Sequence, residues 1–363
     1  MSMKKVTWII VLAGALAQPL SAQSIGERLT LHGFLTQAYA DASDYPIFGI
    51  PQEGTSDLRA AALQFGYRMS DDDKFVVQLS HTRLGTSQLA SLEGDVELDW
   101  GFYQRRFGDA SLRVGKVPMP RGLFNEVRDV GTILPFYRAP KTVYGEGVET
   151  IDGAALSYQV NAGDWGIELG AYGGGFEIAG QTTLESGLIA FESRLTSAYG
   201  GQVIVNLPVP GVRVGATGVK ASISESEETY SPATDGFYIW TASFDAALDR
   251  VSLTAEYEKA HQENVVDYKA YYVRGGVRLA EGLWLNAQAE YNTNTLLAPA
   301  PVAGTDIDGI RDYAVGASYA IHPGLVLKAE YHDFAGYELD VPVDVFGPKA
   351  DDTYFIFSVA TAF

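Results

Sequence analysis

The sequence of 363 residues has no cysteine and only five histidines. Without cysteine there can be no disulfide framework and no thiolate metal site. The histidines stand beside no evident serine nucleophile or metal partner, and the glycine-rich pieces "YGGGF" and "AYGGQ" precede no predicted helix, so a phosphate-binding loop is not supported. We therefore predict no enzyme, no metal and no cofactor.

Basic residues and long apolar runs are also scarce. Lysine and arginine number 26 against 45 aspartates and glutamates, a net charge of −19, which is a poor match for nucleic acid. After residue 22 no apolar stretch reaches the ~20 residues that a helix needs to cross a bilayer. The one apolar run, "VTWIIVLAGALA", follows the basic "MSMKK" and precedes possible cleavage sites after Ala17 and Ala22. This layout is typical of a secretory signal, so we predict a signal peptide over 1–22 and an exported protein over 23–363.

What the chain does contain is a long series of segments in which apolar and polar residues alternate. We count sixteen of them, from "RLTLHGFLTQAYA" to "TYFIFSVATAF", most about ten residues long. Alternation indicates strands, and a tilted strand of ~9–11 residues is long enough to cross a membrane. In "LWLNAQAEYN", for example, leucine, alanine and tyrosine share one side while asparagine, glutamine and glutamate share the other. The pattern predicts lipid on the first side and a watery lumen on the second.

The connections between these segments alternate strictly between short and long. The short ones are "SDDDK", "GDA", "NAGD", "PVPG", "LDR", "AEG" and "HPG". The others, mostly long, are 41–57, 85–95, 118–150, 174–187, 223–236, 261–267, 293–310 and 335–352. Tight periplasmic turns and longer outer loops are typical of an outer-membrane barrel. We predict an all-β fold, a 16-stranded antiparallel transmembrane β-barrel with long extracellular loops.

The last strand carries Phe355, Phe357 and Phe363 on alternate positions. In hydrocarbon every backbone polar group needs a partner, so the sheet has to close and this strand must pair with the first one. A terminal phenylalanine with apolar residues in phase also resembles the C-terminal signal that marks outer-membrane barrels for insertion. An ordinary edge strand at the end of the chain is the alternative.

The longest connection, 118–150, has four prolines and many apolar residues, unlike a solvated outer loop. This composition favours a loop folded into the lumen over an exposed flap. Such a loop narrows the pore, and its charges then meet those of the wall. The predicted constriction consists of Arg68, Arg105 and Arg113 on the wall and Arg121, Glu126, Arg128, Asp129, Arg138 and Lys141 on the loop. Structural ion pairs that tie the loop to the wall are the alternative role for each of these charges.

The distribution of charge between the lumen and the outer loops bears on ion selectivity. Lumen-facing acids and bases nearly cancel, whereas turns and outer loops such as "SESEET" and "ELDVPVD" are acidic. An acidic mouth attracts cations, an effect screened within ~8 Å at physiological salt. This predicts a weak cation preference. The acids could instead bridge to lipopolysaccharide through divalent cations, or serve solubility alone.

At "RVGKVPMPRGLFNEVRDVGTILPFYRAPKTVY" the chain resembles bacterial porins. The pattern Arg-x-Gly-Lys, Pro-x-Gly-Leu and Asn-Glu-x-Arg-Asp is similar to porins related to the phosphate-selective type, although the lumen lacks their dense arginine and lysine. Over the whole exported chain the layout resembles sixteen-stranded trimeric porins. The resemblance implies an integral outer-membrane homotrimer that lets small hydrophilic solutes and ions diffuse passively, in contact with outer-membrane lipid and lipopolysaccharide.

Three alternatives to a general porin stay open. A substrate-selective porin for anions or organic acids would share the fold. A non-conducting barrel could act as an adhesin or structural protein, since long outer loops tolerate many roles. An outer-membrane phospholipase or protease would need a catalytic constellation, which the sequence does not show.

Overall fold

A computed structural model describes residues 23–24, 28–86, 96–145, 148–184, 187–224, 233–297, 304, 306–336 and 350–363. The predicted signal peptide, 1–22, lies outside these residues, as do large parts of the acidic outer loops. Within the described part of the chain, no helix is long and apolar enough to cross a membrane.

The described chain is almost entirely β-strand, and neighbouring strands are antiparallel throughout. The predicted sixteen strands are confirmed, with one addition, the two-residue β1 (Gln23–Ser24), which pairs with β2. The sixteen are β2 (Leu29–Ala42), β3 (Thr55–Arg68), β4 (Asp73–Leu84), β5 (Glu97–Phe107), β6 (Ala110–Pro118), β7 (Thr150–Ala162), β8 (Trp165–Leu184), β9 (Gly187–Asn206), β10 (Val212–Ile223), β11 (Thr234–Ala247), β12 (Val251–Gln262), β13 (Val266–Ala280), β14 (Leu283–Leu296), β15 (Asp306–His322), β16 (Leu325–Gly336) and β17 (Ala350–Ala362).

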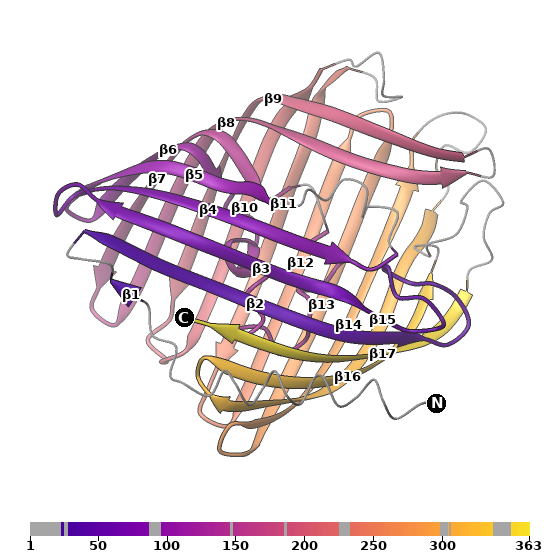
Figure 1. The fold of residues 1–363 in the computed structure, drawn as a ribbon. Helices are drawn as coiled ribbons and strands as arrows, with labels where there is room; N and C mark the ends of the chain where they lie inside the picture. Colours follow the sequence, from indigo (N-terminus) through magenta and orange to yellow (C-terminus); the bar gives the residue numbers. More distant parts are fainter. Residues whose placement is uncertain are drawn as a thin grey trace.

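The barrel closes where β17 lies beside β2 (Figure 1). Pairing runs from Tyr354 opposite Ala42 to Ala362 opposite Phe34. Beyond it, the backbones of Gly33 and Phe363 exchange hydrogen bonds of 3.1 and 2.9 Å. Gly33 also leaves room for the Phe363 ring, because a Cβ there would lie 2.8 Å from it. The closed sheet therefore leaves no unpaired edge to face lipid, as membrane barrels require.

The two faces of the wall differ as the alternation predicts. On β14 and β15, Leu285 and Val315 are 51% and 53% exposed, whereas Gln288 and Glu290 are buried on the opposite face. Four aromatic side chains, Trp240, Tyr257, Tyr271 and Tyr291, form a band on the outside of β11–β14, which we call the aromatic girdle. Within it Trp240 packs on Tyr257 at 5.2 Å and Tyr271 on Tyr291 at 5.5 Å. Aromatic girdles of this kind mark the level of the membrane interface.

One predicted loop is largely strand. The segment 174–187 was expected to be an outer connection, but β8 continues to Leu184 and β9 begins at Gly187. A register shift between Gly174 and Phe176 absorbs the glycines without ending the pairing. The two 20-residue strands extend as a hairpin past their neighbours (Figure 1).

Candidate functional site

The third outer connection folds into the barrel over its described residues, 119–145 and 148–149, as predicted. It contains one short 3-10 helix, η2 (Asn125–Val127), and most of its described side chains are buried. Its backbone N–H groups donate to side chains on the inner face of the wall. Gly122 N–H donates to Thr217 on β10 at 3.1 Å, and Thr142 N–H donates to Glu290 on β14 at 2.9 Å. The loop therefore crosses the lumen while its polar backbone stays satisfied.

One end of the loop is fastened by Arg121. Its guanidinium donates from Nε and Nη2 to the two carboxylate oxygens of Glu258 on β12, at 3.0 and 2.7 Å. Both side chains are buried, and Thr241 donates to the same carboxylate at 3.0 Å. Burial alone lowers the pKa of Arg121, but the charge of Glu258 raises it, and the outcome lies above the ordinary value. Arg121 is thus a fixed cation that anchors the loop.

A second anchor beside it is built around Glu256. The carboxylate accepts hydrogen bonds from the backbone N–H of Leu123 at 2.9 Å and from the hydroxyls of Tyr144 and Tyr272, the latter at 2.7 Å. The hydroxyl of Tyr144 in turn accepts from the N–H of Leu123 and of Phe124. Alternation along β12 puts Glu256 on the lumen side of the wall, but the sequence gives no sign that this residue holds the loop.

Arg128 also holds the loop in place, and its side chain is not exposed to the lumen. Its guanidinium donates to the carbonyls of Tyr144 and Gly145 and lies 3.4 Å from Glu149, with 7% of the residue exposed. Arg121 and Arg128 therefore occupy the structural role that the sequence had left open as an alternative. Neither side chain faces the water of the lumen.

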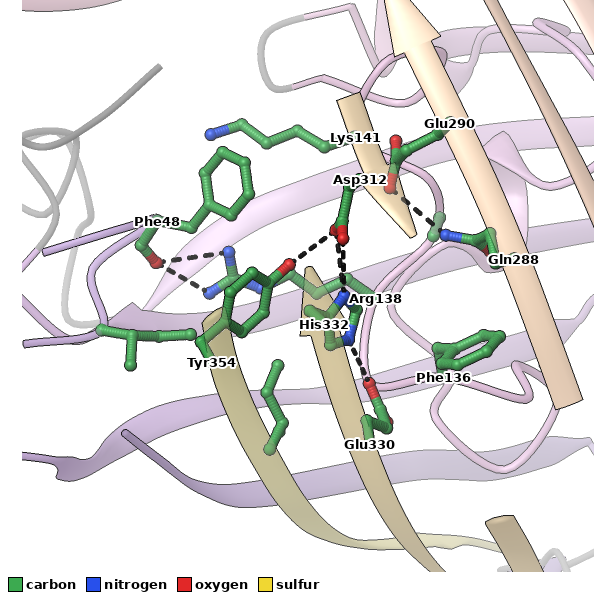
Figure 2. A pocket seen from close by; sticks show the side chains of 13 residues that line it. Phe48, Phe136, Arg138, Lys141, Gln288, Glu290, Asp312, Glu330, His332 and Tyr354 are labelled. Atoms are coloured by element: carbon green, nitrogen blue, oxygen red, sulfur yellow. Dashed lines mark hydrogen bonds and ion pairs between the residues drawn. The ribbon is translucent and has the colours of Figure 1, made fainter. Parts of the chain in front are cut away.

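At its far end the loop borders a small cavity against β14–β17 (Figure 2). Its volume is about 40 Å³, room for a few water molecules at most. Arg138 and Lys141 of the loop border it, opposite Glu290, Asp312 and Glu330.

The wall of this cavity is a network of buried polar side chains. His332 Nδ1 lies 2.9 Å from Asp312, and its Nε2 lies 3.4 Å from Glu330. The Tyr354 ring stacks on His332 at 4.3 Å and its hydroxyl donates to Asp312 at 2.7 Å. Glu330 also accepts the backbone N–H of Tyr137 at 2.6 Å, so the network grips the loop.

The first outer connection, 43–54, also contacts this cavity. This contact was not predicted from the sequence. Ile47 and Ile50 exchange backbone hydrogen bonds of 3.0 and 2.8 Å around a tight turn at Phe48 and Gly49, both with positive φ. Arg138 donates to the Phe48 carbonyl at 3.4 Å, and Lys141 Nζ lies 3.9 Å from the centre of the Phe48 ring. The apolar content "PIFGIP" is the signal that could have revealed this second inward loop.

The open side of the third loop is acidic. Glu126 and Asp129 are exposed, and the Glu126 carboxylate lies 3.4 Å from Arg113 on β6. Arg113 is itself held over the Phe102 ring at 5.1 Å. Glu126 and Arg113 therefore meet across the gap between loop and wall.

The wall facing Glu126 is basic. Lys74 on β4 lies within electrostatic range of Arg106, Arg113 and Glu126, and Arg68 is directly opposite Lys74 on β3. Arg68 is therefore on the inner face, as predicted, close to the periplasmic turn. Lys74 and Arg106 were missed, because one follows a polar turn and the other belongs to the face that strict alternation assigns to lipid.

The prediction for Arg105 is wrong. It shares the outer face with Tyr103 and Phe107, lies 3.6 Å from Asp73, and its guanidinium is 5.4 Å from the centre of the Phe107 ring. The cause is a β-bulge: Gln78 pairs with Trp100 but Leu79 pairs with Leu98, so Asp99 is an extra residue. Each residue after the bulge therefore points to the face opposite to that expected from simple alternation.

The described residues offer no group of histidine, aspartate and glutamate side chains suited to hold a metal ion. What the arrangement provides instead is a fastened loop inside a barrel of sixteen strands, a size that encloses an aqueous channel. Opposed acidic and basic side chains across a narrow opening create a field that acts on passing ions and polar solutes.

Three solved structures of bacterial outer-membrane proteins share this fold. OmpF of Salmonella typhi, in complex with daunomycin, has a TM-score of 0.63 at 12% identity, over 94% of this chain and all of that one. The outer membrane channel DcaP of Acinetobacter baumannii has a TM-score of 0.60 at 11% identity, over 95% of this chain and all of that one. OmpT of Vibrio cholerae, in a trimer form, has a TM-score of 0.57 at 16% identity, over 92% of this chain and 99% of that one.

No protein-family model and no curated relative matches the sequence. The likeness is therefore one of fold. The fold is that of a bacterial outer-membrane barrel, which agrees with the predicted location in the outer membrane.

Proposed function

We propose that this barrel is a porin, an aqueous channel through which small hydrophilic solutes and ions diffuse passively across the outer membrane. The observation that carries the proposal is the third loop, which is fastened by Arg121 and Glu256 inside the barrel and leaves Glu126 beside Arg113 in the opening. In a barrel of this size, a loop held in this way would narrow an aqueous passage. The structural similarity to the outer membrane channel DcaP supports this function.

A weak cation preference is the selectivity we propose first. The chain carries 45 acidic and 26 basic residues, and the acids gather in the turns and outer loops. An acidic mouth raises the local concentration of cations, and salt screens the effect over ~8 Å. The preference should therefore fade as the salt concentration rises.

Selectivity for anionic solutes such as organic acids is a second candidate, and one observation favours it. Arg68, Lys74, Arg106 and Arg113 gather on one stretch of the inner wall. Near them the loop exposes Glu126, with Asp129 three residues further on. Guanidinium groups recognise carboxylates by paired hydrogen bonds. A reversal potential of anion-preferring sign in a potassium chloride gradient would select this second candidate.

We also propose a homotrimer. Asp57, Arg59 and Arg83 lie on the outward face of β3 and β4, joined by ion pairs of 2.8 and 2.6 Å. They share that face with Leu63 and Leu79, where charges would be costly against hydrocarbon. Contact with another copy of the chain would remove this cluster from lipid. The trimer form known for OmpT supports this assembly.

Planar bilayers test the function directly. Purified folded protein should produce stepwise conductance, and a variant lacking 121–140 should conduct more, because that segment occupies part of the lumen. Folded protein without channels would contradict the porin and favour an adhesin or structural barrel. An unchanged conductance after the deletion would show that this segment does not limit the passage. Hydrolysis of lipid or peptide by the purified protein would favour the enzyme alternative.

A further inference from the structure

We infer that the outer surface of β10–β13 binds the phosphate groups of lipopolysaccharide directly, through Lys259 and Lys269. This inference extends the proposed function, because it assumes a barrel embedded in the outer membrane. Lys259 on β12 and Lys269 on β13 stand directly opposite each other in the sheet. Directly opposed residues have Cβ atoms about 5 Å apart, so one phosphate could contact both ammonium groups.

The level of this lysine pair is fixed by the aromatic girdle. Lys259 is two residues beyond Tyr257, and Lys269 two residues before Tyr271, so each lies on the extracellular side of its tyrosine. Two residues along a strand correspond to about 7 Å. The girdle marks the membrane interface, which places the lysines at the level of the outer-leaflet headgroups.

The pair has no opposing charge of its own. Among the described residues neither lysine takes part in an ion pair, and like charges directly opposite each other destabilise a sheet. The acid nearest in register on this face, Asp267, is bound to His261 at 2.7 Å. In a chain with a net charge of −19, an uncompensated basic pair is best explained by an anion supplied from outside.

The surroundings extend the site along the sheet. Trp240 is directly opposite Lys259 on β11 and is 40% exposed. Lys220 on β10 is also exposed, opposite Tyr238, whose ring stacks on His261 at 5.0 Å. Ammonium groups above exposed aromatic rings suit a ligand with a phosphorylated sugar head and apolar chains.

Native mass spectrometry with purified lipid A tests the assignment. The folded protein should bind lipid A that carries two phosphates in the presence of EDTA, and bind phosphate-free lipid A at least tenfold more weakly. The double variant Lys259→Gln/Lys269→Gln should lose at least tenfold in affinity, while Lys259→Arg/Lys269→Arg should retain binding. Arg250→Gln is the matched control, since Arg250 is an exposed cation on the opposite rim of the barrel.

Two results would overturn the inference. Unchanged binding by the double glutamine variant would exclude the lysine pair, and binding that requires Mg²⁺ would favour bridging by the acidic loops. Conductance measurements distinguish a failure of the lipid-binding inference from a failure of the porin proposal. The glutamine variant should conduct like the wild type, so loss of channels with retained lipid binding would count against the porin alone.

Discussion

Arg105 and Arg113 lie on the adjacent strands β5 and β6, yet their side chains leave opposite faces of the wall. Arg113 is opposite Gln104 and reaches Glu126 of the third loop, whereas the neighbouring Arg105 packs with Phe107 and Asp73 on the outside. The register of the β5–β6 hairpin places them on opposite faces, and the bulge at Asp99 is the reason that simple alternation from Glu97 assigns Arg105 to the lumen. The same residue type on two faces of one hairpin gives a matched pair for testing the pore.

Arg113→Gln should shift the reversal potential toward greater cation preference. A unit charge about 4 Å from an ion in water contributes about 1 kcal/mol, which corresponds to a change of up to about fivefold in the permeability ratio. Arg105→Gln should leave the reversal potential unchanged, because that side chain does not reach the lumen. Equal shifts in the two variants would mean that the charges act from a distance and that Arg113 does not line the opening.

Arg121→Leu should loosen the third loop. The substitution leaves Glu258 buried without its partner, and breaking a buried ion pair costs about 3–5 kcal/mol. We expect noisier conductance and faster cleavage by trypsin after Arg128 and Lys141. Arg121→Leu/Glu258→Leu removes both charges and should restore much of the stability. If the single variant is as quiet and as resistant as the wild type, the ion pair does not hold the loop.

Gly33→Ala should weaken the seam of the barrel. A methyl group there would lie 2.8 Å from the Phe363 ring and 2.9 Å from the Ala62 carbonyl oxygen, and overpacking of this kind typically costs about 1–3 kcal/mol. The urea midpoint of unfolding should fall. Gly218→Ala is the control, since its nearest neighbour would be 3.6 Å away. A similar decrease in both variants would point to backbone effects rather than to closure.

Alkaline pH should release the loop through Tyr137. Burial raises the pKa of this phenol from 10.0 to about 12, so the docked loop favours the neutral form. That contribution is complete below pH 10 and is lost as the pH rises through 12. Two pKa units correspond to about 3 kcal/mol. Conductance noise should therefore increase between pH 10 and 12 in the wild type and less in Tyr137→Phe. Identical pH profiles would show that this phenol does not couple to docking.

The strand order and the two faces of the wall could be predicted from sequence because each depends on neighbouring residues. Alternation fixes the face, turn residues fix the hairpins, and the need to pair every backbone group brings the strand ending at Phe363 to the first strand. The same reasoning failed at Arg105, where one extra residue reversed the faces. It also missed the inward turn at Phe48.

The constriction shows a similar division. Its loop was predicted from the apolar and proline content of 118–150, and Glu126 of that loop lies beside Arg113 of the wall. The roles of Arg121 and Arg128 as anchors were not predictable, because their partners are set by where the loop crosses the barrel.

The sequence alone determined the barrel, its apolar outer surface and the loop that enters it, because these follow from local periodicity and composition. Only the tertiary structure decided which basic side chains face the water of the lumen and which form the ion pairs that hold the loop. The physical reason is that an ion pair such as Arg121 with Glu258 joins residues 137 positions apart, and only the closed barrel brings them within hydrogen-bond distance.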